Sequence, residues 1–180
     1  MTFDKSYILS RPVSSSDHAQ GSTNAKVTLV EYGDYQCPYC AQAFYVVKKL
    51  QEDFGDNLQF VFRNFPLTQI HRYAFKAAQA TEIADDYGKF WQMHDTIYNN
   101  QNLLNDEELL VFAENIGIDA QAFTAKLNNN EKQQRVQDDF DSGVKSGVQG
   151  TPTFFINNEK YGGPTDYESL KILLEKHLNQ

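Results

Sequence analysis

The chain has 180 residues, a length typical of one domain or of a small domain with one insertion. Hydrophobic residues make up 41% of it and aromatic residues 13%, which excludes a wholly disordered chain. The 16 Lys and Arg residues against 24 Asp and Glu give a formal net charge of −8, which argues against nucleic acid as the main partner because phosphate binding needs clustered Lys and Arg.

The apolar segments are too short to span a membrane. The longest unbroken apolar runs, 43–47 and 109–113, have five residues each. A spanning helix needs about 20, so no membrane span is expected. The amino terminus also lacks the basic start and long apolar stretch of a signal peptide. We therefore expect a cytoplasmic protein, or a periplasmic or otherwise extracytoplasmic one if a leader has been removed.

Residues 1–26 are expected to form an amino-terminal extension. Pro12, three consecutive serines at 14–16 and Gly21 interrupt the segment, and it carries little periodic apolar signal. This pattern predicts an irregular segment before the first strand.

A strand, a helix and a second strand are predicted next. The run 27–32 is rich in β-branched and aromatic residues, which is typical of a buried strand. Apolar residues repeat near the helical period over 41–54, so a helix should begin at or within the Cys-Pro-Tyr-Cys motif at 37–40. Residues 58–65 predict the second strand. Short links between these elements indicate a right-handed βαβ unit.

The segment 68–147 predicts a run of helices. Apolar residues at helical spacing mark five successive stripes along it. Asn105 followed by Glu108 matches a capping box, and Asp119 can cap a further helix. Residues 105–141 hold nine acidic and three basic side chains, which is most simply the solvated face of a helical lobe.

Strand signals return near the end of the chain. Residues 153–156 predict a strand, and a tight turn after it allows 160–161 to pair back. Thr165 with Glu168 suggests a capping box ahead of a last helix. The order of elements predicts an α/β domain built from 27–67 and 148–180, interrupted by an all-helical insertion over 68–147.

The two cysteines lie three positions apart, at Cys37 and Cys40. A bridge closing so short a loop would stabilise the fold little, so the pair indicates chemistry or a metal site. Half of a zinc site is one alternative, and two inert thiols are another. Zinc would need two more ligands, and the four histidines show no close pair of the usual spacing.

The position of Cys37 at the start of a helix indicates an activated thiol. The free N–H groups and the positive end of the helix dipole favour the thiolate, so a depressed pKa is expected for Cys37. Cys37 is then the natural attacking sulfur. Cys40 lies one turn deeper and is placed to resolve a mixed disulfide.

Several separated motifs together resemble a known family. A strand of sequence Val-Thr-Leu-Val-Glu-Tyr-Gly-Asp-Tyr-Gln runs into Cys-Pro-Tyr-Cys, and further matching segments occur at 62–67, 90–95 and 147–156. In this order they resemble the DsbA-like branch of the thioredoxin superfamily, over nearly everything from Val27 to the carboxyl terminus. The resemblance implies a thioredoxin fold with a helical insertion.

The resemblance implies roles for the four residues of the cysteine motif. Cys37 matches the nucleophile of the family and Cys40 its resolving cysteine. Pro38 and Tyr39 match the intervening pair that tunes the reduction potential. Tyr39 replaces the histidine of the best-known periplasmic members, which removes one cationic stabiliser of the thiolate.

The resemblance also implies two sites distant in sequence. Thr151 and Pro152 match the cis-proline dipeptide that faces the active-site disulfide and binds substrate; the competing interpretation is a trans proline opening an edge strand. Glu31 matches a buried acid beneath the site. Buried, it would have a raised pKa and could take the proton from Cys40, whereas on the exposed face of its strand it would have no such role.

The leading hypothesis is therefore a thiol–disulfide oxidoreductase that acts on protein or peptide thiols and disulfides, needs no metal or organic cofactor, and is recycled by a redox partner. One alternative is a glutathione-dependent isomerase or transferase relative on the same scaffold, although those typically lack a cysteine pair. Another is a redox-insensitive binding module whose helical lobe recognises a partner. Oxidases, reductases and isomerases share these motifs, so the direction of exchange stays open. His71, His94 and Trp91 are expected to be packing or surface residues outside the site.

Overall fold

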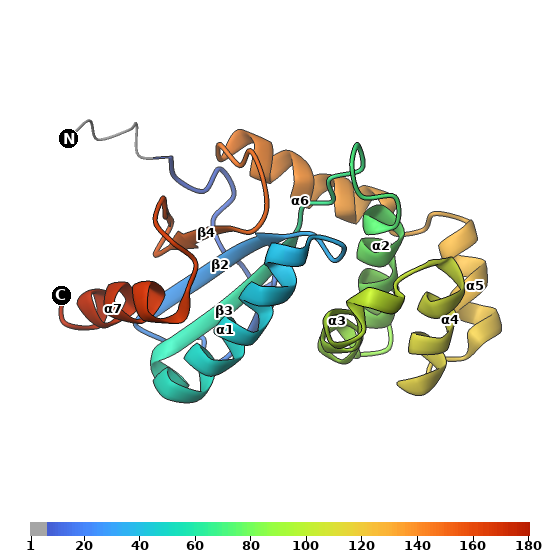
Figure 1. Ribbon diagram of the computed structural model, residues 1–180, viewed down its shortest axis with the longest axis horizontal. Helices are drawn as coiled ribbons and strands as arrows, with labels where there is room; N and C mark the ends of the chain where they lie inside the picture. Colours follow the sequence, from blue (N-terminus) through green and yellow to red (C-terminus); the bar gives the residue numbers. More distant parts are fainter. Residues whose placement is uncertain (1–6) are drawn as a thin grey trace.

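A mixed five-stranded sheet forms the centre of the computed structural model, which describes residues 7–180 (Figure 1). The strand order is β1-β3-β2-β4-β5, and β2 and β3 are parallel while the other neighbouring pairs are antiparallel. The strands are β1 His18–Gln20, β2 Val27–Gly33, β3 Leu58–Asn64, β4 Thr153–Ile156 and β5 Glu159–Lys160.

The two faces of the sheet are covered by different parts of the chain. Helices α1 (Pro38–Phe54) and α7 (Tyr167–Leu178) contact each other and pack on one face. Successive side chains of β2 point to opposite faces, so Leu29 packs on the α1 side and Val30 on the other. The second face is covered by the amino-terminal segment and by α6.

The helical insertion lies between β3 and β4. Figure 1 shows α2 to α5 gathered to one side of the sheet, with α6 leading back towards β4. This arrangement confirms the α/β architecture with an all-helical insertion that the sequence predicts. The helices are α2 Ala74–Asp85, α3 Phe90–Asn99, α4 Asp106–Asn115, α5 Ala120–Asn128 and α6 Gln133–Lys145, with short 3-10 turns at Gly55–Asn57 and Gln101–Leu103. Among the described residues, none of the helices has the length and hydrophobicity needed to cross a bilayer.

Two of the three predicted helix caps are confirmed. The side chain of Asn105 accepts a hydrogen bond from the Glu108 backbone N–H at 2.8 Å. Asp119 caps α5 in the same way. The predicted cap of the last helix at Thr165 is wrong: the N-cap is the next residue, Asp166, which accepts from the Ser169 backbone N–H at 3.0 Å. A carboxylate at this position is a stronger acceptor than a threonine hydroxyl.

The amino-terminal segment is less irregular than predicted. Residues 18–20 form β1, which pairs with β3, and Leu9 is buried on the sheet. At the opposite edge, the Leu9 backbone N–H donates to Asn158 O at 3.0 Å and the Lys160 N–H to Tyr7 O at 2.8 Å. A three-residue strand is too short to carry an alternating pattern, so only its pairing with β3 reveals it.

A buried ion pair ties this segment to the sheet. Neither the Arg63 nor the Asp17 side chain is exposed, and Arg63 Nε and Nη2 donate to Asp17 Oδ1 and Oδ2 at 2.8 and 3.0 Å. Arg63 Nη1 also donates to the Tyr32 hydroxyl and to the Arg11 carbonyl, both at 2.9 Å. The guanidinium therefore holds the amino-terminal segment against β3.

Arg63→Met is expected to lower the free energy of unfolding by about 3 kcal/mol, because it removes the principal cation bound to the buried Asp17 carboxylate and leaves only the Arg11 guanidinium at 3.4 Å and the Ser14 backbone N–H. Urea unfolding measures this loss. The control is Lys76→Met at the exposed Lys76–Asp106 pair, where the loss should stay below about 1 kcal/mol. Equal losses in the two variants would contradict a special role for the buried pair.

Candidate active site

The cysteine motif lies where β2 ends and α1 begins. Cys37 is the N-cap of α1, with an extended backbone (φ −72°, ψ 123°), and Pro38 is the first helical residue. Proline suits this position because it has no N–H to leave unbonded and its φ is already helical. Both cysteines are free thiols and both are buried, Cys40 completely. Tyr39 points outward, with 67% of its surface exposed.

The Cys37 sulfur is stabilised as a thiolate. A hydrogen bond from the Cys40 thiol is the largest influence that lowers the pKa of Cys37, to about 5. The backbone N–H groups of Tyr39 and Cys40 add to it, while burial acts in the opposite direction. At neutral pH this sulfur is therefore a nucleophile without any external base.

Cys40 has the opposite property. Burial raises the pKa of Cys40 well above that of a free thiol, and the hydrogen bond shared with Cys37 and the charge of Glu31 raise it further. Cys40 therefore keeps its proton while Cys37 is anionic. The pair therefore combines one ionised sulfur with one protonated sulfur at neutral pH.

Glu31 lies on the face of β2 that carries α1, and it is only 2% exposed. Its Oε1 has no hydrogen-bond partner among the described residues. Burial raises the pKa of Glu31 to about 8, and the negative charge of Cys37 contributes to the rise. The carboxyl group is therefore mostly protonated at neutral pH and sensitive to the charge on the cysteine.

The loop before β4 brings Thr151 and Pro152 to the cysteines. The peptide bond between them is cis, and Thr151 O lies 3.5 Å from Cys37 Sγ. The structure thus assembles Cys37, Cys40 and Thr151 at one edge of the sheet. Within residues 7–180, no three His, Cys, Asp or Glu side chains gather as a metal site would require.

Sequence reasoning missed Asp34, which lies three residues before Cys37. Its carboxylate is buried and accepts the backbone N–H groups of Gln36 and Cys37 at 2.7 and 3.2 Å. It also accepts a hydrogen bond from His71 Nδ1 at 2.8 Å. The sequence analysis expected His71 to lie outside the site. The only local signal for this role is an Asp followed two and three residues later by free N–H groups, the pattern of an Asx turn.

His94 and Trp91, which the sequence analysis expected to be packing or surface residues, lie in the core and against it respectively. His94 Nδ1 is bonded to the Tyr35 hydroxyl at 2.9 Å, and burial lowers the pKa of His94 well below its usual value. Trp91 packs edge-on against His94. Both side chains support the site from behind without reaching the cysteines.

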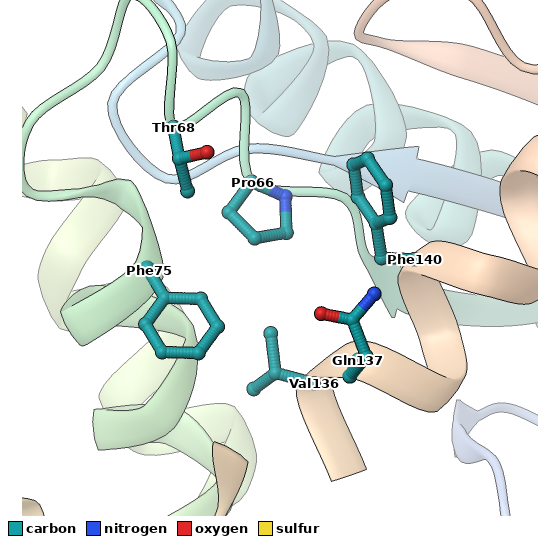
Figure 2. Close-up of a pocket in the computed structure, with 6 residues that line it drawn as sticks. All are labelled: Pro66, Thr68, Phe75, Val136, Gln137 and Phe140. Atoms are coloured by element: carbon teal, nitrogen blue, oxygen red, sulfur yellow. The ribbon is translucent and has the colours of Figure 1, made fainter. Parts of the chain in front are cut away.

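A shallow pocket lies apart from the cysteine motif, between α2, α6 and the segment after β3 (Figure 2). Its lining is mainly apolar and includes no titratable side chain, so it offers shape and apolar surface but no reactive group. The lining residues are Pro66, Thr68, Phe75, Val136, Gln137 and Phe140.

Cys37 should titrate with a midpoint near pH 5 in the reduced protein. The ultraviolet absorbance of the thiolate measures this titration. Cys40→Ala removes the principal hydrogen-bond donor and should raise that midpoint by about one unit or more. Cys37→Ser is the control, and it should show no thiolate in this pH range. An unchanged midpoint in the Cys40→Ala variant would contradict the shared hydrogen bond.

Glu31→Gln should change how the stability of the reduced protein depends on pH. The pKa of Glu31 is about 8 in the folded protein, against about 4.3 in an unfolded chain, so its contribution to stability is lost as the pH rises through 8. Cys37 acts in the opposite sense, because its lowered pKa makes its contribution disappear as the pH falls through 5.

The Glu31→Gln variant retains only the Cys37 effect. Its free energy of unfolding should therefore rise relative to that of the wild type between pH 5 and pH 8. Urea unfolding of both reduced proteins at the two pH values gives the difference. Parallel pH dependences would show that Glu31 ionises as an ordinary exposed acid.

Solved structures of other proteins share this fold. The chain superimposes on oxidised BdbD from Bacillus subtilis with a TM-score of 0.84, 26% identity, and coverage of 98% of this chain and 100% of that chain. It superimposes on alpha-DsbA1 from Wolbachia pipientis with a TM-score of 0.78, 21% identity and 93% coverage of each chain. The likeness to alpha-DsbA1 is one of fold alone.

Comparison with sequences adds a family and a set of longer relatives. The chain is 43% identical over 154 residues to the Na⁺/H⁺ antiporter NhaA 1 of Salinispora arenicola, matching 86% of this chain and 24% of the antiporter. It thus spans about a quarter of the length of the curated relatives it matches. The family model described as Thioredoxin matches residues 14–176. The chain therefore belongs to the thioredoxin family and has the fold of its DsbA-like members, which confirms the family and the fold class predicted from the sequence.

Proposed function

We propose that this chain is a thiol–disulfide oxidoreductase that exchanges disulfides with protein or peptide thiols through Cys37 and Cys40. The observation that carries the proposal is the opposite shift of the two sulfurs: the pKa of Cys37 is lowered to about 5, while that of Cys40 is raised. Exchange requires a thiolate to attack and a second thiol to resolve the product. The fold shared with BdbD, whose structure is of an oxidised form, supports a redox role for the pair.

From the reduced state, exchange proceeds in two steps. The Cys37 thiolate attacks one sulfur of a substrate disulfide; a bond forms between Cys37 and that sulfur, and the other substrate sulfur leaves as a thiolate. Cys40 then gives up its proton and attacks Cys37 Sγ, which forms the Cys37–Cys40 disulfide and releases the second substrate sulfur. Two electrons pass from the cysteine pair to the substrate, and the reverse sequence oxidises a dithiol.

Glu31 is proposed to accept the Cys40 proton. The Cys37 thiolate contributes to the raised pKa of Glu31, and this charge disappears when Cys37 enters a mixed disulfide. Loss of the charge favours the carboxylate form of Glu31 at the step in which Cys40 must be deprotonated. A larger fraction of Glu31 is then ionised and able to accept a proton at the step in which Cys40 must lose one.

Thr151 and Pro152 are proposed to bind the substrate chain. Thr151 O lies 3.5 Å from Cys37 Sγ, so a peptide lying along the backbone of this loop would bring its own sulfur next to the nucleophile. Backbone hydrogen bonds of this kind accept many sequences, because they read the main chain. Protein and peptide substrates fit such a surface.

The stabilised thiolate also favours one direction of disulfide exchange and one kind of recycling partner. Stabilising the reduced pair makes its disulfide a stronger oxidant, which favours transfer of the disulfide to a substrate. A redox partner that accepts electrons from the reduced pair would then restore it. The cytoplasmic location expected from the sequence stays a prediction. In the cytoplasm the thiol pool would keep the cysteine pair reduced, in contrast to recycling by a partner that accepts its electrons.

Cys37→Ser should abolish the exchange of a disulfide-linked peptide substrate, whereas Cys40→Ser should accumulate a mixed disulfide between Cys37 and the peptide. Non-reducing electrophoresis and mass spectrometry detect the trapped species, and reductant should release it. The two variants are matched controls for each other. Full exchange activity in both variants would refute the proposal, and saturable glutathione binding without exchange would point to the glutathione-dependent alternative.

A further inference from the structure

The side chain of Asp34 is an unusually well-bonded buried carboxylate. Asp34 is 1% exposed. Its Oδ1 accepts the backbone N–H groups of Gln36 and Cys37 at 2.7 and 3.2 Å. Its Oδ2 accepts the Leu67 backbone N–H at 2.7 Å and His71 Nδ1 at 2.8 Å. Four donors surround one carboxylate, and hydrogen bonds to a charged acceptor are the strong ones.

These four donors come from two loops. Gln36 and Cys37 belong to the turn between β2 and α1, whereas Leu67 and His71 belong to the segment between β3 and α2. A second bond joins the same two loops, because Gln36 Oε1 accepts the Tyr73 backbone N–H at 2.7 Å. The carboxylate therefore fixes the turn that carries the nucleophile against a neighbouring loop.

The position of the Cys37 sulfur depends on this turn. Asp34 binds the N–H of Cys37 with both its side chain and its carbonyl oxygen, at 3.2 and 3.1 Å. This holds Cys37 in the extended backbone conformation of an N-cap, directly before the first turn of α1. The Asp34 N–H also lies 3.5 Å from Cys40 Sγ.

We propose that Asp34 is the positioning residue of the exchange site and that His71 supports it by donating a hydrogen bond to its carboxylate. This proposal rests on the proposed function. The carboxylate acts through the backbone of Cys37, holding the sulfur where the helix terminus and Cys40 stabilise the thiolate. His71 completes the tie to the second loop.

A positioning role and a purely electrostatic role predict opposite results for Asp34→Asn. Removing a negative charge near Cys37 would by itself favour the thiolate and lower the pKa of Cys37. An amide keeps one acceptor oxygen but turns its NH₂ group towards the other pair of N–H donors, which breaks the tie between the cysteine turn and the second loop. If positioning dominates, the pKa of Cys37 rises by about one unit and alkylation of Cys37 at acidic pH slows about tenfold.

Asp139→Asn is the matched control. Asp139 is equally buried and accepts a backbone N–H, that of Asn64 at 3.0 Å, along with Arg11 and Arg135. It does not contact the cysteine turn, so its replacement should lower stability and leave the pKa of Cys37 unchanged. A fall or no change in that pKa in folded Asp34→Asn protein would overturn the proposal.

His71 supplies a milder test if Asp34→Asn fails to fold. In His71→Asn, the side-chain amide can still donate to Asp34 from the place of Nδ1, whereas His71→Leu keeps the bulk and loses the donor. His71→Leu should raise the pKa of Cys37 and slow alkylation about threefold, and His71→Asn should restore both. Equal behaviour of the two variants would remove His71 from the proposal.

Thiolate titration and alkylation do not require a disulfide substrate. A protein that shows the expected pKa changes without any exchange activity would support the positioning role and refute the proposed function. Normal exchange with an unaltered Cys37 pKa in Asp34→Asn would do the reverse.

Discussion

The interaction between the two cysteine sulfurs gives Cys37 and Cys40 opposite pKa shifts. Cys40 is fully buried, so its own ionisation is suppressed, and its proton is available to stabilise the anion on Cys37. The helix start contributes backbone N–H groups to the same anion. The two pKa values separate because the Cys40 thiol and the helix N–H groups lower that of Cys37, while burial raises that of Cys40.

The fold brings three distant segments to this pair. The end of β2 supplies Glu31 and the turn with the cysteines, the loop after β3 supplies the contacts to Asp34, and the loop before β4 places Thr151 against Cys37. The β2–β3 pair is parallel, so both strands end at the same edge of the sheet. The helical insertion begins beyond this edge, and its side chains, such as His94, pack behind the turn.

Asp34 and Glu31, the two buried acids at the site, differ in the number of hydrogen-bond donors around them. Asp34 has four donors, which satisfy the carboxylate and make it a structural anchor. Glu31 has an oxygen without a partner among the described residues, and its pKa is raised to about 8. Burial alone therefore does not decide the role of an acid, because the hydrogen-bond donors around it matter as well.

Local patterns in the sequence determined the strand–helix–strand unit, the helical insertion, the position of the cysteine pair at a helix start and the caps at Asn105 and Asp119. These features depend on residues close together in the chain, where periodicity and capping act. Tertiary structure alone decided the pairing of β1, the burial of Glu31 and the bonds of Asp34 to Leu67 and His71. Each of these depends on partners more than 25 residues away or on what covers a strand face, and a side chain carries no record of its distant neighbours until the chain is folded.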